Sequence, residues 1–209
     1  MKYQFLIVFF IITFQLSISV ASHRELRTLT DPNYGTHMVP LLTIVAHTAG
    51  PILELGCGDF STPLLHAVCR PQKRYLLSTD TSKEWLDLFL DLETQWHHFQ
   101  YVPVYENDWD SNPKPELWNL VGQAIHWSVV LVDHRPGERR IIDIIRLREH
   151  ADIFVVHDTQ QETYGYELVL NTFKYQYVYK RYATTTTIVS DNIDISSFFH
   201  ESTGEIVAA

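Results

Sequence analysis

Short apolar runs alternate with amphipathic segments along most of this chain. Each of five runs is nearly free of polar residues, and the segment after each run has apolar residues at the spacing of one helix face. Strands that are apolar throughout belong to sheets covered on both faces, and their alternation with helices is typical of parallel pairing. The predicted strands are 52–55, 75–78, 99–104, 128–132 and 153–156, and the predicted helices are 36–47, 61–69, 81–92, 118–124, 141–148 and 164–171.

The end of the chain breaks this alternation. Residues 173–182 and 184–189 are rich in Tyr, Val and Thr and leave no room for a helix between them. We expect them to form a hairpin, so that one edge of the sheet is antiparallel. The sequence therefore predicts an α/β, Rossmann-like fold with a seven-stranded, mostly parallel sheet, a C-terminal antiparallel hairpin and helices on both faces.

Two weaker patterns concern surface residues. Tyr175, Tyr177 and Tyr179 alternate along the first strand of the hairpin, which predicts one exposed aromatic face. His97 and His98 are predicted to lie on the solvent-facing side of a helix.

The N-terminus has a different pattern. Residues 1–22 carry one cation, Lys2, followed by a dense apolar run from residue 5 to 16 and then by small residues. The run is about a dozen residues long, shorter than the ~20 residues of a membrane span and typical of a signal peptide. A cleaved signal peptide is predicted, with an uncleaved signal anchor as the alternative. Either one places residues 23–209, a single domain, in the secretory pathway, and the anchor would be its membrane contact.

Composition narrows the class of partner. The 209 residues include 16 basic and 25 acidic ones, for a formal net charge of −9. An acidic chain is poorly suited to grip nucleic acid through its phosphates, so no nucleic-acid partner is expected. The two cysteines, Cys57 and Cys69, are separated by a predicted helix that holds them too far apart for a disulfide, which predicts two free thiols.

Acidic residues recur where the predicted strands end. In open α/β sheets, ligands bind beyond the carboxyl ends of the strands. Gly56 and Gly58 follow the first strand and let the backbone approach a ligand closely. An acid about 20 residues after such a loop is placed to bind ribose hydroxyls. The pattern predicts an adenosine-type site, and the acids at the strand ends are Glu54, Asp80, Asp108, Asp133 and Asp158.

The stretch "ILELGCGDFST" carries a more specific signal. It resembles the first motif of the class I S-adenosylmethionine-dependent methyltransferases, with an acid, one residue, Gly, one residue and Gly. The resemblance covers about residues 36–195 and implies a seven-stranded sheet that ends in a hairpin. It implies that the glycine loop, with Gly56 and Gly58, lies against the methionine part of the cofactor and that Asp80 binds its ribose. Glu54, just before the loop, would help to hold a cationic ligand of this kind. It also implies that Asp108 and Trp109 meet the adenine.

The segments after the fourth and fifth strands carry the candidate chemistry. In "VDHRPGERR", Asp133 and His134 are candidate catalytic residues, with His134 as general base. Arg139 and Arg140 would either hold an anionic substrate or lie on a solvated helix face. In "VVHDTQ", His157 is a second candidate base.

A metal is the other candidate at these strand ends. Some members of the resembled family, similar to catechol O-methyltransferase, bind Mg²⁺ here. The resemblance therefore makes Asp133 and Asp158 candidate Mg²⁺ ligands, although Thr159 replaces the Asn of that pattern. The segment Tyr34 to His37 would close over the cofactor or cap the first helix.

These observations favour an S-adenosylmethionine-dependent methyltransferase that acts on an oxygen of a small molecule or sugar in the secretory pathway. One alternative is a non-catalytic binding or scaffold protein on the same fold, which would not bind the cofactor. The other is a nucleotide-dependent oxidoreductase, which would bind a nicotinamide cofactor instead.

Overall fold

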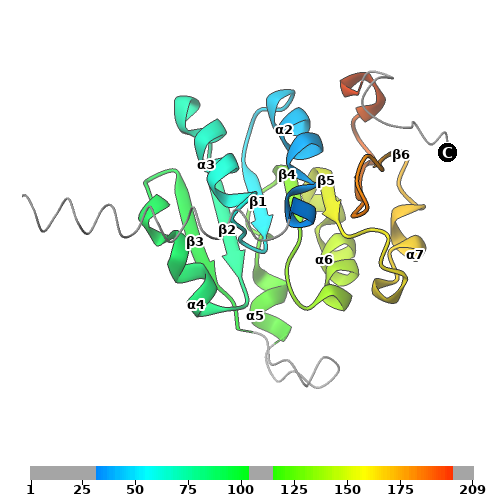
Figure 1. Cartoon of the computed structure of the whole chain (residues 1–209). Helices are drawn as coiled ribbons and strands as arrows, with labels where there is room; N and C mark the ends of the chain where they lie inside the picture. Colours follow the sequence, from blue (N-terminus) through cyan, green and yellow to red (C-terminus); the bar gives the residue numbers. More distant parts are fainter. Residues whose placement is uncertain (1–31, 104–114, 200–209) are drawn as a thin grey trace, which may run out of the picture. The chain divides into compact units, whose positions relative to one another are not determined.

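The protein is built around a seven-stranded sheet, and Figure 1 shows how the helices are arranged around it. The computed structural model describes residues 32–103 and 115–199. The strand order is β3-β2-β1-β4-β5-β7-β6; the first five strands are parallel, and β7 runs antiparallel between β5 and β6. This confirms the predicted mostly parallel sheet and its C-terminal antiparallel hairpin. The strands are β1 (Ile52–Leu55), β2 (Leu76–Asp80), β3 (His97–Tyr101), β4 (Trp127–Val132), β5 (Ala151–His157), β6 (Tyr175–Tyr179) and β7 (Thr186–Ser190).

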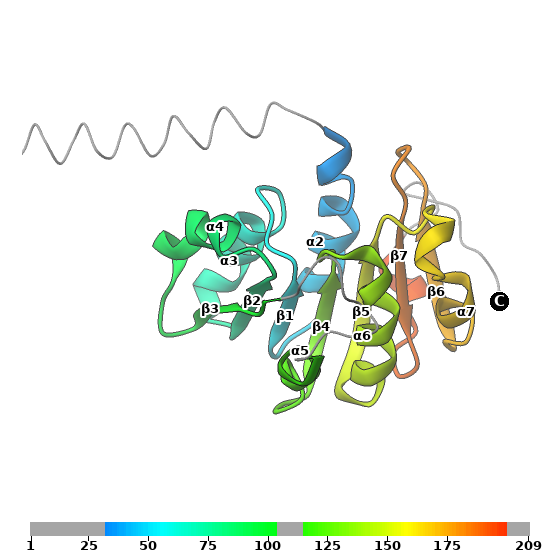
Figure 2. The ribbon, with the colours of Figure 1, turned by 90° about the horizontal axis from the view of Figure 1, so that it is seen from below.

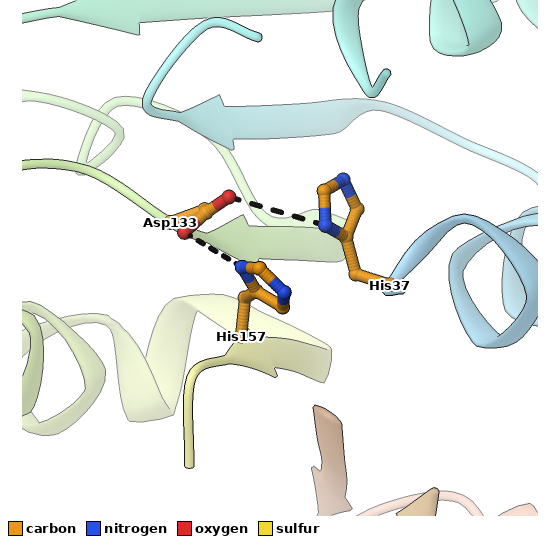
Figure 3. A group of neighbouring side chains, drawn as sticks. All are labelled: His37, Asp133 and His157. Carbon is orange, nitrogen blue, oxygen red and sulfur yellow. Dashed lines mark hydrogen bonds and ion pairs between the residues drawn. The ribbon is translucent and has the colours of Figure 1, made fainter. Parts of the chain in front are cut away.

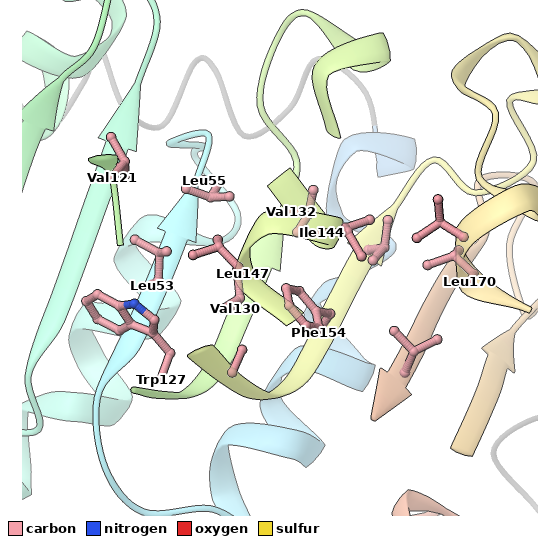
Figure 4. Close-up of a cluster of buried hydrophobic side chains, with 14 of the residues drawn as sticks. Leu53, Leu55, Val121, Trp127, Val130, Val132, Ile144, Leu147, Phe154 and Leu170 are labelled. Carbon is pink, nitrogen blue, oxygen red and sulfur yellow. The ribbon is translucent and has the colours of Figure 1, made fainter. Parts of the chain in front are cut away.

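Helices cover both faces of the sheet (Figure 2). Side chains alternate between the faces along a strand, so Ile52 packs with α2 and α3 while Leu53 packs with α5 and α6. Both faces are buried, which is why the inner strands lack an alternating polar pattern. Figure 4 shows the second of these cores, where Ile144 and Leu147 of α6 meet Val130 of β4. The helices are α2 (Met38–Ala46), α3 (Thr62–Cys69), α4 (Lys83–Leu86), α5 (Pro115–Leu120), α6 (Arg140–Leu147) and α7 (Glu167–Leu170).

The third strand begins earlier than predicted. His97 and His98 lie at the start of β3, paired with Leu76 and Leu77 of β2, and not on a helix. Helix α4 is a single turn continued by a 3-10 helix over Asp87–Leu92, which leaves room for the earlier strand. His97 is fully buried, and its Nε2 lies 3.0 Å from the hydroxyl of Ser78.

The predicted exposed aromatic face of the hairpin is wrong. Tyr177 and Tyr179 are both buried. The chain after β7 forms a 3-10 helix over Ile195–Phe198 that packs on β6, and the ring of Phe199 stacks on Tyr177 with 3.9 Å between ring centroids. The alternating tyrosines of β6 therefore mark a buried face, which is covered by a segment that comes later in the sequence.

Two further predictions concern covalent structure and the N-terminus. Cys57 and Cys69 are both free and buried, which confirms the predicted thiols. Over residues 32–103 and 115–199, no helix has the length and apolar character needed to cross a membrane. The predicted signal segment, residues 1–22, lies outside the described residues, so the signal peptide or anchor stays a prediction.

Candidate functional site

The glycine loop leaves β1 between β2 and β4. Gly56 has a φ of +96°, and a Cβ at this position would lie 2.6 Å from the backbone of Asp133 and of His134. Glycine is therefore required here by conformation and by close approach. At Gly58, an added Cβ would have one close neighbour in the part of the chain that the structure describes, the Oγ of Ser61 at 3.3 Å. Gly58 thus leaves one side of the loop open to a ligand.

Asp80 lies at the end of β2, directly beside this loop, as predicted. Its Oδ2 accepts a hydrogen bond from the backbone N–H of Cys57 at 2.9 Å, and its Oδ1 accepts one from that of Ser82 at 2.8 Å. Burial raises the pKa of Asp80, while these backbone N–H groups act to lower it. A carboxylate has about four acceptor positions, so each oxygen retains capacity for a further donor. The residue fits a ligand that offers a pair of hydroxyls.

The side chain of Glu54 does not face the ligand side of the loop, where the sequence predicts it. Its side chain is fully buried, with Oε1 accepting from Thr62 at 2.9 Å and Oε2 accepting from Ser78. The same Thr62 hydroxyl accepts from the N–H of Gly58 at 2.9 Å. Glu54 therefore holds the glycine loop through Thr62 and does not face the open side of the loop. Burial raises its pKa to about 7.

Asp108 and Trp109, the predicted adenine contacts, lie outside the described residues. Their role stays a prediction.

Three side chains from distant parts of the chain meet at the ends of β4 and β5 (Figure 3). The Nδ1 of His157 lies 3.1 Å from Oδ1 of Asp133, and the Nδ1 of His37 lies 4.0 Å from Oδ2. The hydroxyl of Thr36 contacts the Nε2 of His157 at 2.9 Å. Both imidazoles are 2% exposed, whereas the Asp133 side chain is 22% exposed and forms the open edge of the group. We call His37, Asp133 and His157 the polar centre.

The electrostatics of the polar centre favour a charged carboxylate beside neutral His37. Although burial opposes ionisation, His157 and Arg140 hold the pKa of Asp133 well below its usual range. Burial lowers the pKa of His37 to about 4, outweighing the attraction of Asp133. The ring nitrogens of His37 are buried and have no hydrogen-bond partner among the residues that the structure describes.

Arg140 joins the two predicted metal ligands. Its guanidinium lies 3.0 Å from Oδ1 of Asp133 and 3.4 Å from Oδ2 of Asp158, and its Nε donates to the carbonyl of His134 at 2.7 Å. A fixed cation thus occupies the space between Asp133 and Asp158. The predicted Mg²⁺ site at these two carboxylates is not supported, and neither is a role for Arg140 in holding an anionic substrate, because its charge is already balanced.

His134 points away from the polar centre. Its Nε2 lies 2.9 Å from Oδ2 of Asp143 on α6, and its side chain is 1% exposed. Asp143 also pairs with Arg139 and Arg146. Asp133 and His134 are consecutive residues beyond a strand end, so their side chains leave the chain on opposite sides. The structure therefore places His134 and Arg139 in a buried ionic cluster, which corrects the predicted general base.

His37 has a role that the sequence pattern does not predict. The pattern predicts that it belongs to a segment that closes over a ligand or caps a helix, yet it provides no side-chain cap to α2 and lies in the polar centre. A histidine directly before an apolar helix was the available signal, but nothing in the local pattern indicated that this helix packs beside β4 and β5.

Comparisons with known proteins agree with the topology. No known family model and no curated protein matches the chain. The structure is similar to the S-adenosylhomocysteine-bound methyltransferase PaMTH1 of Podospora anserina, with a TM-score of 0.57, 13% identity, and coverage of 82% of this chain and 87% of that chain. It is also similar to the plantazolicin methyltransferase BpumL, with a TM-score of 0.50, 11% identity, and coverage of 83% and 90%.

A third likeness is to a crystal form of the METTL16 methyltransferase domain, with a TM-score of 0.51 and 13% identity. It covers 75% of this chain and 66% of that chain, so this chain spans about two thirds of its length. At these identities the comparisons establish the architecture. Together with the strand order and the hairpin, they show that the chain has the fold of the class I S-adenosylmethionine-dependent methyltransferases.

Proposed function

We propose that this protein is an S-adenosylmethionine-dependent methyltransferase. The proposal depends on one observation, the hydrogen bond from the backbone N–H of Cys57 in the glycine loop to the carboxylate of Asp80. This hydrogen bond places Asp80, whose carboxylate oxygens can each accept a further hydrogen bond, beside the open side of the glycine loop. Both lie at the carboxyl ends of the parallel strands. In this fold, ligands bind at these ends.

The residues present fit the cofactor. Asp80 would accept hydroxyl hydrogens of the ribose, and the open side of Gly58 would lie against the rest of the molecule. When bound, the cofactor supplies an electrophilic methyl group on a sulfonium. Glu54, through Thr62, would keep the loop in shape and would not touch the ligand.

The polar centre is the candidate site for the acceptor. Gly56 packs against the backbone of Asp133, so the glycine loop and the polar centre are neighbours. An acceptor hydroxyl at Asp133 would meet side chains able to lower its pKa or to hold its proton. Arg139 and Arg140 are neutralised by aspartates, which favours a neutral hydroxyl-bearing acceptor over an anionic one.

A cavity of about 300 Å³ lies between α7 and strands β6 and β7, and no residue of the polar centre or of the glycine loop lines it, so it does not set the size of the acceptor. Hydroxyl and amide side chains line part of it, including Thr159, Gln160 and Thr185. Because Arg139 and Arg140 are neutralised, we infer O-methylation of a small molecule or sugar as the finer form of the proposal. Its location in the secretory pathway rests on the predicted signal in residues 1–22 alone.

Calorimetry on the purified full chain tests the proposal, with S-adenosylmethionine, S-adenosylhomocysteine and NAD⁺ titrated separately. We expect both S-adenosyl compounds to bind and NAD⁺ not to bind. A screen of hydroxyl-bearing acceptors with a radiolabelled methyl donor would then identify the substrate class. Binding of NAD⁺ alone would favour the oxidoreductase alternative, and binding of none would favour the scaffold alternative.

A further inference from the structure

The polar centre has the composition of a cation site. One ligand atom from each of His37, Asp133 and His157 lies within 4.8 Å of the others. Two imidazoles and one carboxylate suit a borderline divalent cation such as Zn²⁺ or Co²⁺ and are a poor match for Mg²⁺, which prefers oxygen ligands. Three protein ligands leave at least one coordination position for another molecule.

His37 is the first observation that points to a ligand. Its side chain is 2% exposed, and within residues 32–103 and 115–199 neither ring nitrogen has a hydrogen-bond partner. A buried polar group left without a partner costs about 1–3 kcal/mol. Its Nδ1 lies 4.0 Å from Oδ2 of Asp133, which is too far for a hydrogen bond. A Zn²⁺ bound to both atoms would hold them roughly 3.4 Å apart at tetrahedral angles, so a small inward movement would complete the site.

His157 is the second. When an imidazole binds a metal through one nitrogen, the other usually donates to a fixed acceptor, which sets the tautomer. Thr36 lies 2.9 Å from the Nε2 of His157 and can accept that proton. Without a metal, the Nδ1–H of His157 can donate to the Asp133 carboxylate at 3.1 Å, and a bound cation would take the place of that proton.

The local charge balance also accommodates a cation. Asp133 and Asp158 contribute two negative charges near the centre and Arg140 contributes one positive charge. Arg140 contacts Oδ1 of Asp133 and leaves Oδ2 on the side of His37. The carboxylate can therefore bind Arg140 through one oxygen and a metal through the other.

We propose that His37, Asp133 and His157 bind one borderline divalent cation of the Zn²⁺ class. Only the role of the cation rests on the proposed function: it would bind an acceptor hydroxyl at the open coordination position. The site itself is independent of S-adenosylmethionine binding.

Titration of the chelator-treated full chain with Co²⁺ alone, followed by visible absorption, tests the site. We expect one equivalent to bind, with the ligand-field bands of a nitrogen- and oxygen-ligated ion, and Zn²⁺ to displace it. His37→Gln and Asp133→Asn should each weaken Co²⁺ binding roughly 100-fold or more. His126→Gln is the matched control, because it removes an imidazole that lies 2.8 Å from the carboxylate of Asp152 elsewhere.

Absence of Co²⁺ binding by the wild type would overturn the proposal, as would unchanged binding in both Asp133→Asn and a folded His37→Gln. Far-ultraviolet circular dichroism establishes whether each variant is folded. If His37→Gln does not fold, Asp133→Asn alone tests the site. The readout contains no methyl donor. A protein that binds Co²⁺ but not S-adenosylmethionine would therefore refute the methyltransferase proposal and leave this one standing.

Discussion

Gly56 lies so close to Asp133 that a Cβ on Gly56 would be 2.6 Å from the carbonyl carbon and oxygen of Asp133. The two residues follow paired positions of neighbouring strands, since Leu55 pairs with Val132. This contact joins the loop that we propose for the cofactor to the polar centre that we propose for the acceptor. Methyl transfer needs these two groups to be held side by side.

Gly56→Ala should damage this contact. The alanine would have to adopt a φ of +96° and displace backbone atoms of Asp133 and His134, just after β4, so we expect a loss of about 2 kcal/mol or more in the free energy of unfolding. Urea denaturation measures it. Gly58→Ala is the control, because its Cβ would meet a side-chain oxygen at 3.3 Å and should cost much less stability. Equal stabilities of the two variants would contradict this account of the loop.

Asp80→Asn should weaken S-adenosylmethionine binding by about 10- to 100-fold. The substitution removes the charge that strengthens hydrogen bonds to ribose hydroxyls, a contribution of about 1.5–3 kcal/mol. Calorimetry checks the affinity. Asp87→Asn removes an exposed carboxylate that pairs with Lys83 and should leave the affinity unchanged. The ribose assignment is wrong if both variants bind as tightly as the wild type.

Asp133→Asn and His134→Gln should separate chemistry from stability. We expect Asp133→Asn to lower turnover by about 100-fold or more while S-adenosylmethionine still binds. His134→Gln loses a buried contact with Asp143, so it should lower the free energy of unfolding by about 1–3 kcal/mol and retain turnover. Single-turnover rates and urea denaturation of each variant measure the two effects. If His134→Gln loses turnover while Asp133→Asn retains it, His134 is the general base after all.

Glu54→Gln should change how stability depends on pH. Burial raises the pKa of Glu54 to about 7 in the folded protein, from an ordinary value of 4.5. The folded protein therefore keeps a proton that the unfolded chain releases, and the contribution of Glu54 to stability falls as pH rises from about 4.5 to 7. The variant cannot ionise, so its free energy of unfolding relative to the wild type should rise by about 3 kcal/mol across this window.

Denaturation of both proteins from pH 4.5 to 8 measures this difference. Subtracting the two curves cancels, to first order, the other titrating groups, such as His97, whose pKa burial lowers to about 3. A difference that stays constant with pH would show that Glu54 is ionised throughout the range.

The thiols of Cys57 and Cys69 should be unreactive in the native protein. Both are buried, and burial raises the pKa of Cys69 to about 11 and that of Cys57 well above its ordinary value. A thiol reagent should label neither cysteine at pH 7 within the time of a native assay and should label both in denaturant. Rapid native labelling would contradict the packing of the glycine loop and α3.

The sequence alone determined the sheet, its rim and the position of Asp80. Apolar runs such as 128–132 and 153–156 are local signals of buried strands, and an acid at a strand end is carried to the rim by the parallel arrangement itself. The glycine loop could also be predicted from the sequence, because the positive φ at position 56 favours glycine over other residue types.

The tertiary structure decided which side chains face one another beyond those strands. Glu54 and His134 are both predicted site residues, but each turns into a buried network, Glu54 with Thr62 and His134 with Asp143. His37 joins Asp133 and His157 although the chain separates them widely. The direction of a side chain at a strand end depends on packing partners that are distant in sequence, and local residue patterns carry no record of them.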